Sequence, residues 1–257
     1  MDKFKLETRQ VSIEFPGVKA LENINFAVST GEIRAVVGAN GAGKSTLMKV
    51  LAGANPTYTG EVLLNDKKVE LQTPVDAKKI GIQIVYQEVD TALYPTLSVA
   101  ENIVQNDMIM GKAGYVVDWG KMYKQGREAL EKLHISREQI DEHELIQNLS
   151  LAKKQMVLIA KAIQAQCNFL ILDEPTAPLS NTETEELFRV VRHLNETENI
   201  AILFISHRLN EILEICESYT VMRNGKIVDT APVTEQTTTK EIVEKMLGRK
   251  FEENFLK

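Results

Sequence analysis

The chain has 257 residues, of which 44% are hydrophobic and 26% charged, so it can bury one large core or two modest subdomains and is not a disordered segment. Its formal net charge of -6 argues against a general nucleic-acid-binding protein, because such a protein normally presents a basic surface. We therefore expect a globular protein with no nucleic-acid partner.

Strand patterns dominate the first third of the chain. Residues 11–15, 24–28 and 61–64 are alternating or β-branched segments. The turn residues Asn65-Asp66 follow the third segment directly. These signals predict a small antiparallel β layer at the N-terminal end.

A short apolar strand at residues 33–37 leads into a glycine-rich stretch, and an amphipathic helix that Gly53 can end follows it. Between the strand and the helix, the chain matches the phosphate-binding pattern G-x-x-x-x-G-K-[ST] at every fixed position. The alternative is a glycine-rich turn that only resembles this loop, but the strand and the helix supply the context that the loop requires. The matching residues are Gly38, Ala39, Asn40, Gly41, Ala42, Gly43, Lys44, Ser45 and Thr46.

This loop predicts binding of a nucleoside triphosphate. Its glycines let backbone N–H groups close around phosphate oxygens. Lys44 can reach the β and γ phosphates, and the Ser45 hydroxyl can ligate Mg²⁺. The helix N-terminus adds roughly half a positive charge at the same place. We therefore expect ATP and Mg²⁺ to bind here.

Helix formers dominate residues 97–165. We interpret this stretch as part of an inserted helical subdomain at about residues 89–165. The remaining residues, 1–88 and 166–257, would form the nucleotide-binding core, so that the whole chain is one domain.

Short apolar strands return at residues 169–172 and 201–205, with a helical segment between them. Thr182 with Glu185 predicts a capping box at the start of that helix. Alternating strands and helices imply an α/β fold with a mostly parallel sheet covered on both faces. Residues 219–228 predict a hairpin, because strand patterns flank an Asn-Gly turn.

Cys167 and Cys216 lie in or beside apolar segments and have no metal-ligand spacing to the four histidines, so we expect both to be buried core residues. No N-terminal segment resembles a signal peptide. The longest apolar run, residues 200–205, is too short to span a bilayer. If the protein works at a membrane, partner subunits must hold it there.

Polar residues that could bind metal or take part in catalysis follow two of the later strands. Asp173 is placed to hold Mg²⁺, and Glu174 to orient or deprotonate an attacking water. The alternative is a surface acidic pair at a strand end. His207 follows the next strand and would point at the same ligand crevice, where it could contact the γ-phosphate, although a lone histidine in such a place is often structural.

The order of these motifs resembles the ATP-binding cassette domain of ABC transporters over essentially the whole chain. The resemblance implies that Gln87 touches Mg²⁺ and senses a transmembrane partner, and that His207 is the switch histidine. It also implies that Phe15 stacks on adenine, with an ordinary core phenylalanine as the alternative. The motifs, in order, are GANGAGKST at 38–46, Tyr86-Gln87-Glu88, Leu149-Ser150, LILDEPTAPLS at 170–180 and ISHRLNEI at 205–212.

The resemblance narrows to the first cassette of the tandem ATPase subunits of bacterial monosaccharide importers of the ribose, xylose and galactose type. The segments that carry it are 15–21, Gln87-Glu88, 206–212 and 247–250. It implies ATP hydrolysis coupled to sugar import, at the cytoplasmic face of the membrane and soluble when isolated. The implied partners are a second cassette in the same polypeptide, transmembrane permease subunits and, indirectly, a periplasmic or extracellular sugar-binding protein.

Two segments depart from the general cassette pattern. The signature, commonly L-S-G-G-Q, reads Leu149-Ser150-Leu151-Ala152-Lys153. Ser150 still has the character of an N-cap whose helix would face the γ-phosphate bound by the opposing cassette. The loss of both glycines restricts close backbone approach, so the site that this segment completes would be slow or only structural. Ser180 stands where cassettes commonly carry an aspartate.

Two other functions compete with sugar import. One is a cassette ATPase without transport that acts on ribosomes or DNA; residues 94–102 count against it, because they resemble the region by which importer cassettes grip a membrane subunit. The other is a regulatory module that uses ATP only as a dimerisation switch. The presence of both Glu174 and His207 makes that function less fitting.

Overall fold

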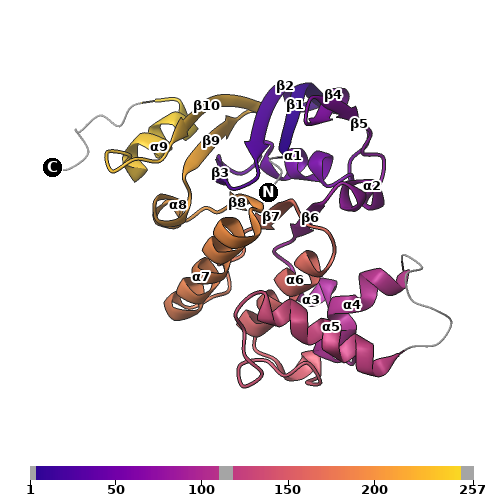
Figure 1. Cartoon of the computed structure of the whole chain (residues 1–257). Coiled ribbons are helices and arrows are strands. Elements are labelled where there is room, and N and C mark those ends of the chain that lie inside the picture. Colours follow the sequence, from indigo (N-terminus) through magenta and orange to yellow (C-terminus); the bar gives the residue numbers. More distant parts are fainter. Residues whose placement is uncertain (1–3, 110–117, 250–257) are drawn as a thin grey trace. The chain divides into compact units, whose positions relative to one another are not determined.

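The computed structural model describes residues 4–109 and 118–249, drawn as a coloured ribbon in Figure 1. The chain divides into two compact units, one formed by residues 1–77 and 201–257 and the other by residues 78–200. Our division at residues 89 and 165 stays a prediction. The expected motif segment 247–250 is described up to residue 249, and residues 110–117 of the expected helical stretch lie outside the described part.

The first unit contains the predicted antiparallel layer, a sheet of order β2-β1-β4-β5. Its inward-facing side chains include Leu6, Val11 and Ile13 of β1, which alternate with polar residues as a half-buried strand requires. Asn65 and Asp66 make the turn between β4 and β5. Both have positive φ, which matches the right-handed twist of the two strands in a hairpin. The strands are β1 (Lys5–Phe15), β2 (Val18–Ser29), β4 (Thr59–Leu64) and β5 (Lys67–Val69).

The first unit also contains a mostly parallel group of strands. Strand β3 (Ile33–Val37) pairs in parallel with β8 (Ala201–Ile205) on one side and with β9 (Ser218–Arg223) on the other. All five residues of β8 are buried, as expected for a strand covered on both faces. The predicted hairpin is confirmed, with β10 (Lys226–Pro232) antiparallel to β9. The helices here include α1 (Lys44–Leu51), α8 (Leu209–Ile215) and α9 (Thr239–Leu247), and α2 (Pro74–Lys79) begins at the unit's edge.

The second unit combines two parallel strands, β6 (Ile82–Val85) and β7 (Phe169–Asp173), with most of the helices. Helices α4 and α5 pack closely, because a Cβ on Gly126 would lie 2.6 Å from the Cβ of Ala100. Residues 132–150, expected to be mainly helical, hold turns and the short 3-10 helix η1 (Ile146–Asn148). The helices are α3 (Val89–Ala92), α4 (Val99–Ile109), α5 (Trp119–Glu131), α6 (Leu151–Gln164) and α7 (Asn181–Glu198).

The predicted capping box is wrong by two residues. Helix α7 is capped by Ser180, whose hydroxyl accepts from the Glu183 N–H, while the Glu183 carboxylate accepts from the Ser180 N–H at 2.8 Å. Both S/T-x-x-E patterns fit the sequence equally well. Burial of Leu179 at 7% exposure fixes the chain just before Ser180, so the helix starts there.

The cysteine prediction holds for one residue of the two. Cys216 is buried, and burial raises the pKa of its thiol. Cys167 is only partly buried as a residue, and both thiols are free.

Candidate functional site

The glycine-rich loop lies between β3 and α1, as the sequence predicts. Gly43 is the N-cap of α1 with φ of 103°, and Gly41 has φ of 79°, a region that side chains with a Cβ rarely adopt. A Cβ on Gly38 would lie 2.4 Å from the Met222 carbonyl oxygen, so only glycine fits there. By contrast, a Cβ on Gly41 would meet nothing within 4 Å. The loop is thus tight on its inner side and open at Gly41.

Lys44 folds back over its own loop. Its ammonium donates to the carbonyl oxygens of Gly38 at 2.7 Å and Ala39 at 3.2 Å, and the residue is 7% exposed. The next residue, Ser45, is exposed at the start of α1. The cation therefore lies within the curve of the loop, where phosphate oxygens could replace the carbonyls as acceptors.

His207 and the loop lie at the same edge of the first unit's parallel strands. Strands β3 and β8 are parallel neighbours, and the loop follows β3 while His207 follows β8. His207 is exposed. The turn that carries it is held by the Ser206 hydroxyl, which donates to Glu211 at 2.8 Å and accepts from the Arg208 N–H at 3.0 Å.

The second unit repeats this arrangement with Gln87 and the acidic pair. Strands β6 and β7 are parallel, and Val85 lies opposite Leu172, so Gln87 and Asp173 follow neighbouring strand ends. Tyr86, next to Gln87, lies near enough to Asp173 to feel its charge. Burial, and secondarily the negative charge of Asp173, raise the pKa of the Tyr86 hydroxyl. Gln87 is exposed and Asp173 is partly buried. The structure thus places Asp173, an expected Mg²⁺ ligand, and Gln87, expected to touch Mg²⁺ and to sense a transmembrane partner, after the ends of neighbouring strands.

Glu174 has an unusual backbone. Its φ is 48°, in the left-handed region, where a residue with a side chain is strained. The residue is partly buried, and its carbonyl accepts from the Ala177 N–H at 3.2 Å. Such strain persists only where the surrounding structure enforces it, and it gathers at functional sites. No local sequence pattern predicts this backbone conformation at Glu174.

Two lysines of α6 hold the helix that follows Gln87, and sequence reasoning missed both. Lys154 donates to the Asp90 carboxylate at 2.8 Å. Lys161, two turns later on α6, donates to the Ala92 carbonyl at 3.2 Å, and burial lowers its pKa. Both ends of α3 are therefore tied to α6. Only the spacing of seven residues between the two lysines could have hinted at this.

Ser150 caps α6, as predicted, with its hydroxyl accepting from the Lys153 N–H at 3.4 Å. The two residues in place of the signature glycines begin the helix, with Leu151 38% exposed and Ala152 buried. The exposed Leu151 side chain covers backbone that a glycine would leave open.

Phe15 ends β1 and is 43% exposed, so it is not the core phenylalanine of the alternative interpretation. Its proposed contact with adenine stays a prediction. A flat, accessible ring is what such a contact needs.

Comparison with known proteins identifies the family. The family model described as ABC transporter matches residues 21–177, which is more than half of the chain. The chain therefore belongs to the ABC transporter family, as an ATP-binding cassette, and is a nucleotide-binding domain.

Two relatives match nearly the full chain. The xylose import ATP-binding protein XylG of Thermoanaerobacter pseudethanolicus is 40% identical over 257 residues, covering 99% of this chain and 49% of that protein. The ribose import ATP-binding protein RbsA 1 of Rubrobacter xylanophilus is 42% identical over 250 residues, covering 97% of this chain and 48% of that protein. The chain thus spans about half the length of the curated relatives it matches.

Solved structures confirm the predicted fold class. The ADP conformation of MJ1267, an ATP-binding cassette of an ABC transporter, matches with a TM-score of 0.81 at 23% identity, over 97% of this chain and 100% of that chain. CbiO1 from Clostridium perfringens, part of the ABC transporter complex cbiONQ, matches with a TM-score of 0.78 at 25% identity, over 96% of both chains. No helix within residues 4–109 and 118–249 combines the length and apolar character needed to cross a membrane.

Proposed function

We propose that the chain is one cassette of a subunit that binds and hydrolyses ATP to power import of a monosaccharide across a membrane. The observation that carries this proposal is identity of about 40% along the whole chain to import ATP-binding proteins for xylose and ribose. The L-arabinose transport ATP-binding protein AraG of Geobacillus stearothermophilus, 39% identical, supports the same substrate class.

The residue roles follow from the loop geometry and the family resemblance. Lys44 would hold the β and γ phosphates, with the backbone N–H groups of residues 38–46 closing around them. The loop fits this group, because it is open at Gly41 and presents a cation within its curve. Phe15 would stack on adenine, and His207 would contact the γ-phosphate.

Mg²⁺ would be held by Ser45 and Asp173, with Gln87 touching it and sensing the permease. Hydroxyl, carboxylate and amide oxygens suit this hard cation. When bound, it would supply charge neutralisation at the β and γ phosphates. Glu174 would orient or deprotonate the attacking water, since it follows directly after Asp173 at the strand end.

The assembly would comprise several partners. Because the relatives are about twice as long, we propose that this chain is the first half of a tandem subunit and pairs with a second cassette in the same polypeptide. Ser150 at the capped start of α6 would face the ATP of that cassette. The subunit would dock peripherally on permease subunits at the cytoplasmic face, with a separate sugar-binding protein delivering the substrate.

The test uses the full-length subunit reconstituted with its permease in vesicles, with labelled xylose, ribose and galactose as substrates. Lys44→Ala should lower ATP affinity by about 10- to 100-fold, because it removes a charge-assisted contact to phosphate, and should abolish import. Lys49→Ala, on the exposed side of the same helix, should change neither. Unchanged ATP affinity in a folded Lys44→Ala protein would contradict the assignment. Full turnover without permease, together with no import, would favour a cassette ATPase outside transport.

A further inference from the structure

One buried carboxylate in the first unit has no place in the proposed mechanism, although it lies close to a proposed site residue. Glu211 is on α8, four residues after His207, and is 7% exposed. A buried charge destabilises a protein unless it is paired and hydrogen-bonded. The partners of Glu211 therefore indicate what its carboxylate does.

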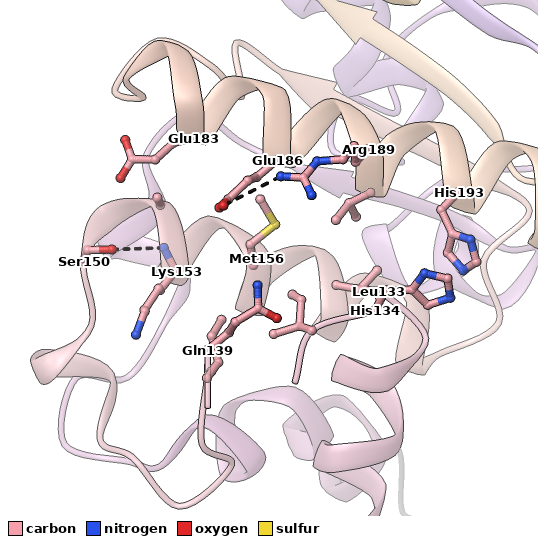
Figure 2. Close-up of a pocket in the computed structure, with 14 residues that line it drawn as sticks. Leu133, His134, Gln139, Ser150, Lys153, Met156, Glu183, Glu186, Arg189 and His193 are labelled. Atoms are coloured by element: carbon pink, nitrogen blue, oxygen red, sulfur yellow. Dashed lines mark hydrogen bonds and ion pairs between the residues drawn. The ribbon is translucent and has the colours of Figure 1, made fainter. Parts of the chain in front are cut away.

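Some acidic side chains of the second unit contact only their own helix. Glu186 pairs with Arg189 one turn later on α7, at 3.8 Å, on the wall of a pocket of about 410 Å³ (Figure 2). This pocket is bounded by the loop that follows α5, by α6 and by α7. Glu183, on the same wall, closes the capping box with Ser180. Such contacts stabilise the helix that makes them.

The Glu211 carboxylate instead contacts the residues on both sides of His207. One oxygen accepts from the Ser206 hydroxyl at 2.8 Å, and the other accepts from the Arg208 guanidinium at 3.2 Å. The Ser206 hydroxyl in turn accepts from the Arg208 N–H at 3.0 Å. These three hydrogen bonds, which we call the Glu211 clamp, join the residue before the imidazole to the residue after it.

The Glu211 clamp is anchored at both ends. Ser206 is 4% exposed and directly follows β8, whose five residues are all buried. Glu211 lies in the first turn of α8, which also buries Ile212 and Ile215. His207 lies between these anchors and is exposed. The clamp therefore restricts the backbone on both sides of the histidine, while the ring stays accessible.

The Glu211 clamp also balances its own charge. The Arg208 guanidinium pairs with the carboxylate, and the Glu211 side chain is 9% exposed in this pair. An unpaired carboxylate beside His207 would repel a phosphate, whereas the ion pair carries no net charge. The pair can thus hold the turn without weakening the site for an anion.

We propose that Glu211 is a positioning residue, which orients His207 toward the γ-phosphate through Ser206 and Arg208. This inference rests on the proposed contact between His207 and the γ-phosphate, and adds a residue that acts through its neighbours. Groups at a reacting centre must be held within about 0.5 Å of their productive geometry, and misplacement by about 1 Å can cost roughly 10²-fold in rate. Loss of the clamp should therefore slow hydrolysis and leave ATP binding unchanged.

The test measures single-turnover ATP hydrolysis by the full-length subunit reconstituted with its permease. Glutamine has one acceptor oxygen and no charge, so Glu211→Gln cannot serve both Ser206 and Arg208. It should slow hydrolysis about tenfold with unchanged ATP affinity. Ser206→Ala, which removes the shared hydroxyl, should slow hydrolysis as well. Glu214→Gln makes the same chemical change at an exposed position of α8 and should have no effect.

A double-mutant cycle with His207→Ala separates positioning from a general structural role. If Glu211 acts through His207, Glu211→Gln should slow the His207→Ala protein by less than about twofold. The same tenfold loss in both backgrounds would overturn the proposal, and so would unchanged hydrolysis in Glu211→Gln beside slow hydrolysis in His207→Ala. Unchanged hydrolysis in His207→Ala would instead overturn the proposed contact of His207 itself, and the positioning role with it.

Hydrogen exchange gives a readout that does not depend on turnover. The Arg208 N–H is bonded to the Ser206 hydroxyl, which Glu211 holds in place. Exchange over residues 206–211, followed by mass spectrometry, should be faster in Glu211→Gln and unchanged in Glu214→Gln. Thermal unfolding checks that each variant is folded. Unchanged exchange in Glu211→Gln would show that the turn holds without the carboxylate, and would overturn the proposal.

Discussion

The strained backbone of Glu174 leads to a prediction that separates stability from catalysis. Its φ of 48° lies where residues with a side chain are disfavoured. Replacing Glu174 by glycine or by alanine removes the same carboxylate and all its contacts. The two variants then differ only in how readily the backbone adopts this conformation.

The expected difference follows from two opposing terms. The left-handed conformation costs a residue with a Cβ roughly 1–2 kcal/mol. Glycine avoids that cost, but it lowers the free energy of unfolding by about 0.4–1 kcal/mol relative to alanine, because the unfolded chain has more conformational entropy with glycine. Glu174→Gly should therefore be more stable than Glu174→Ala by about 1 kcal/mol. At an ordinary helical position such as Glu185, which is exposed on α7, alanine should instead be the more stable by about 1 kcal/mol.

Urea unfolding of the four variants measures these differences, read as shifts of the midpoint at constant slope. In the full subunit, Glu174→Gly and Glu174→Gln should both lower single-turnover ATP hydrolysis by roughly 10²–10⁴-fold while ATP still binds, since general-base help is lost. Glycine and alanine of equal stability at position 174 would show that the backbone there is unstrained. Wild-type turnover in Glu174→Gln would remove the proposed catalytic role.

Three further outcomes are expected. Ser180→Ala should lower the free energy of unfolding by about 1 kcal/mol in urea titrations, whereas Thr182→Ala, inside the helix, should change it little; equal losses would contradict the observed cap. Gly53→Ala should lower the free energy of unfolding by more than about 1 kcal/mol, because φ at Gly53 is 68° and a Cβ would lie 2.2 Å from the Thr73 carbonyl oxygen; an unchanged melting temperature would refute this. In reconstituted transporter, Ser150→Ala should slow sugar import less than Lys44→Ala, because the altered signature completes the slower ATP site; equally complete losses would rule out that asymmetry.

Much of this protein could be predicted from local sequence. The loop at residues 38–46, the turn at Asn224-Gly225 and the Ser150 cap were all placed correctly. Each depends on residues within one turn or one loop, where glycine conformation and side-chain capping act over a few residues. Short, mostly apolar runs likewise predicted β3, β7 and β8, because a strand that is covered on both faces has apolar residues on both sides.

Only the tertiary structure decided the features that join distant residues. Lys154 meets Asp90 across 64 positions of sequence, and the pocket is built from three separate elements. The start of α7 was also beyond local signals, because Ser180 and Thr182 compete as caps until burial of Leu179 selects one. The strain at Glu174 has the same origin: its φ is imposed by the packing around it, against the residue's own preference. Local patterns carry no information on which distant groups will pack together, and that packing sets these features.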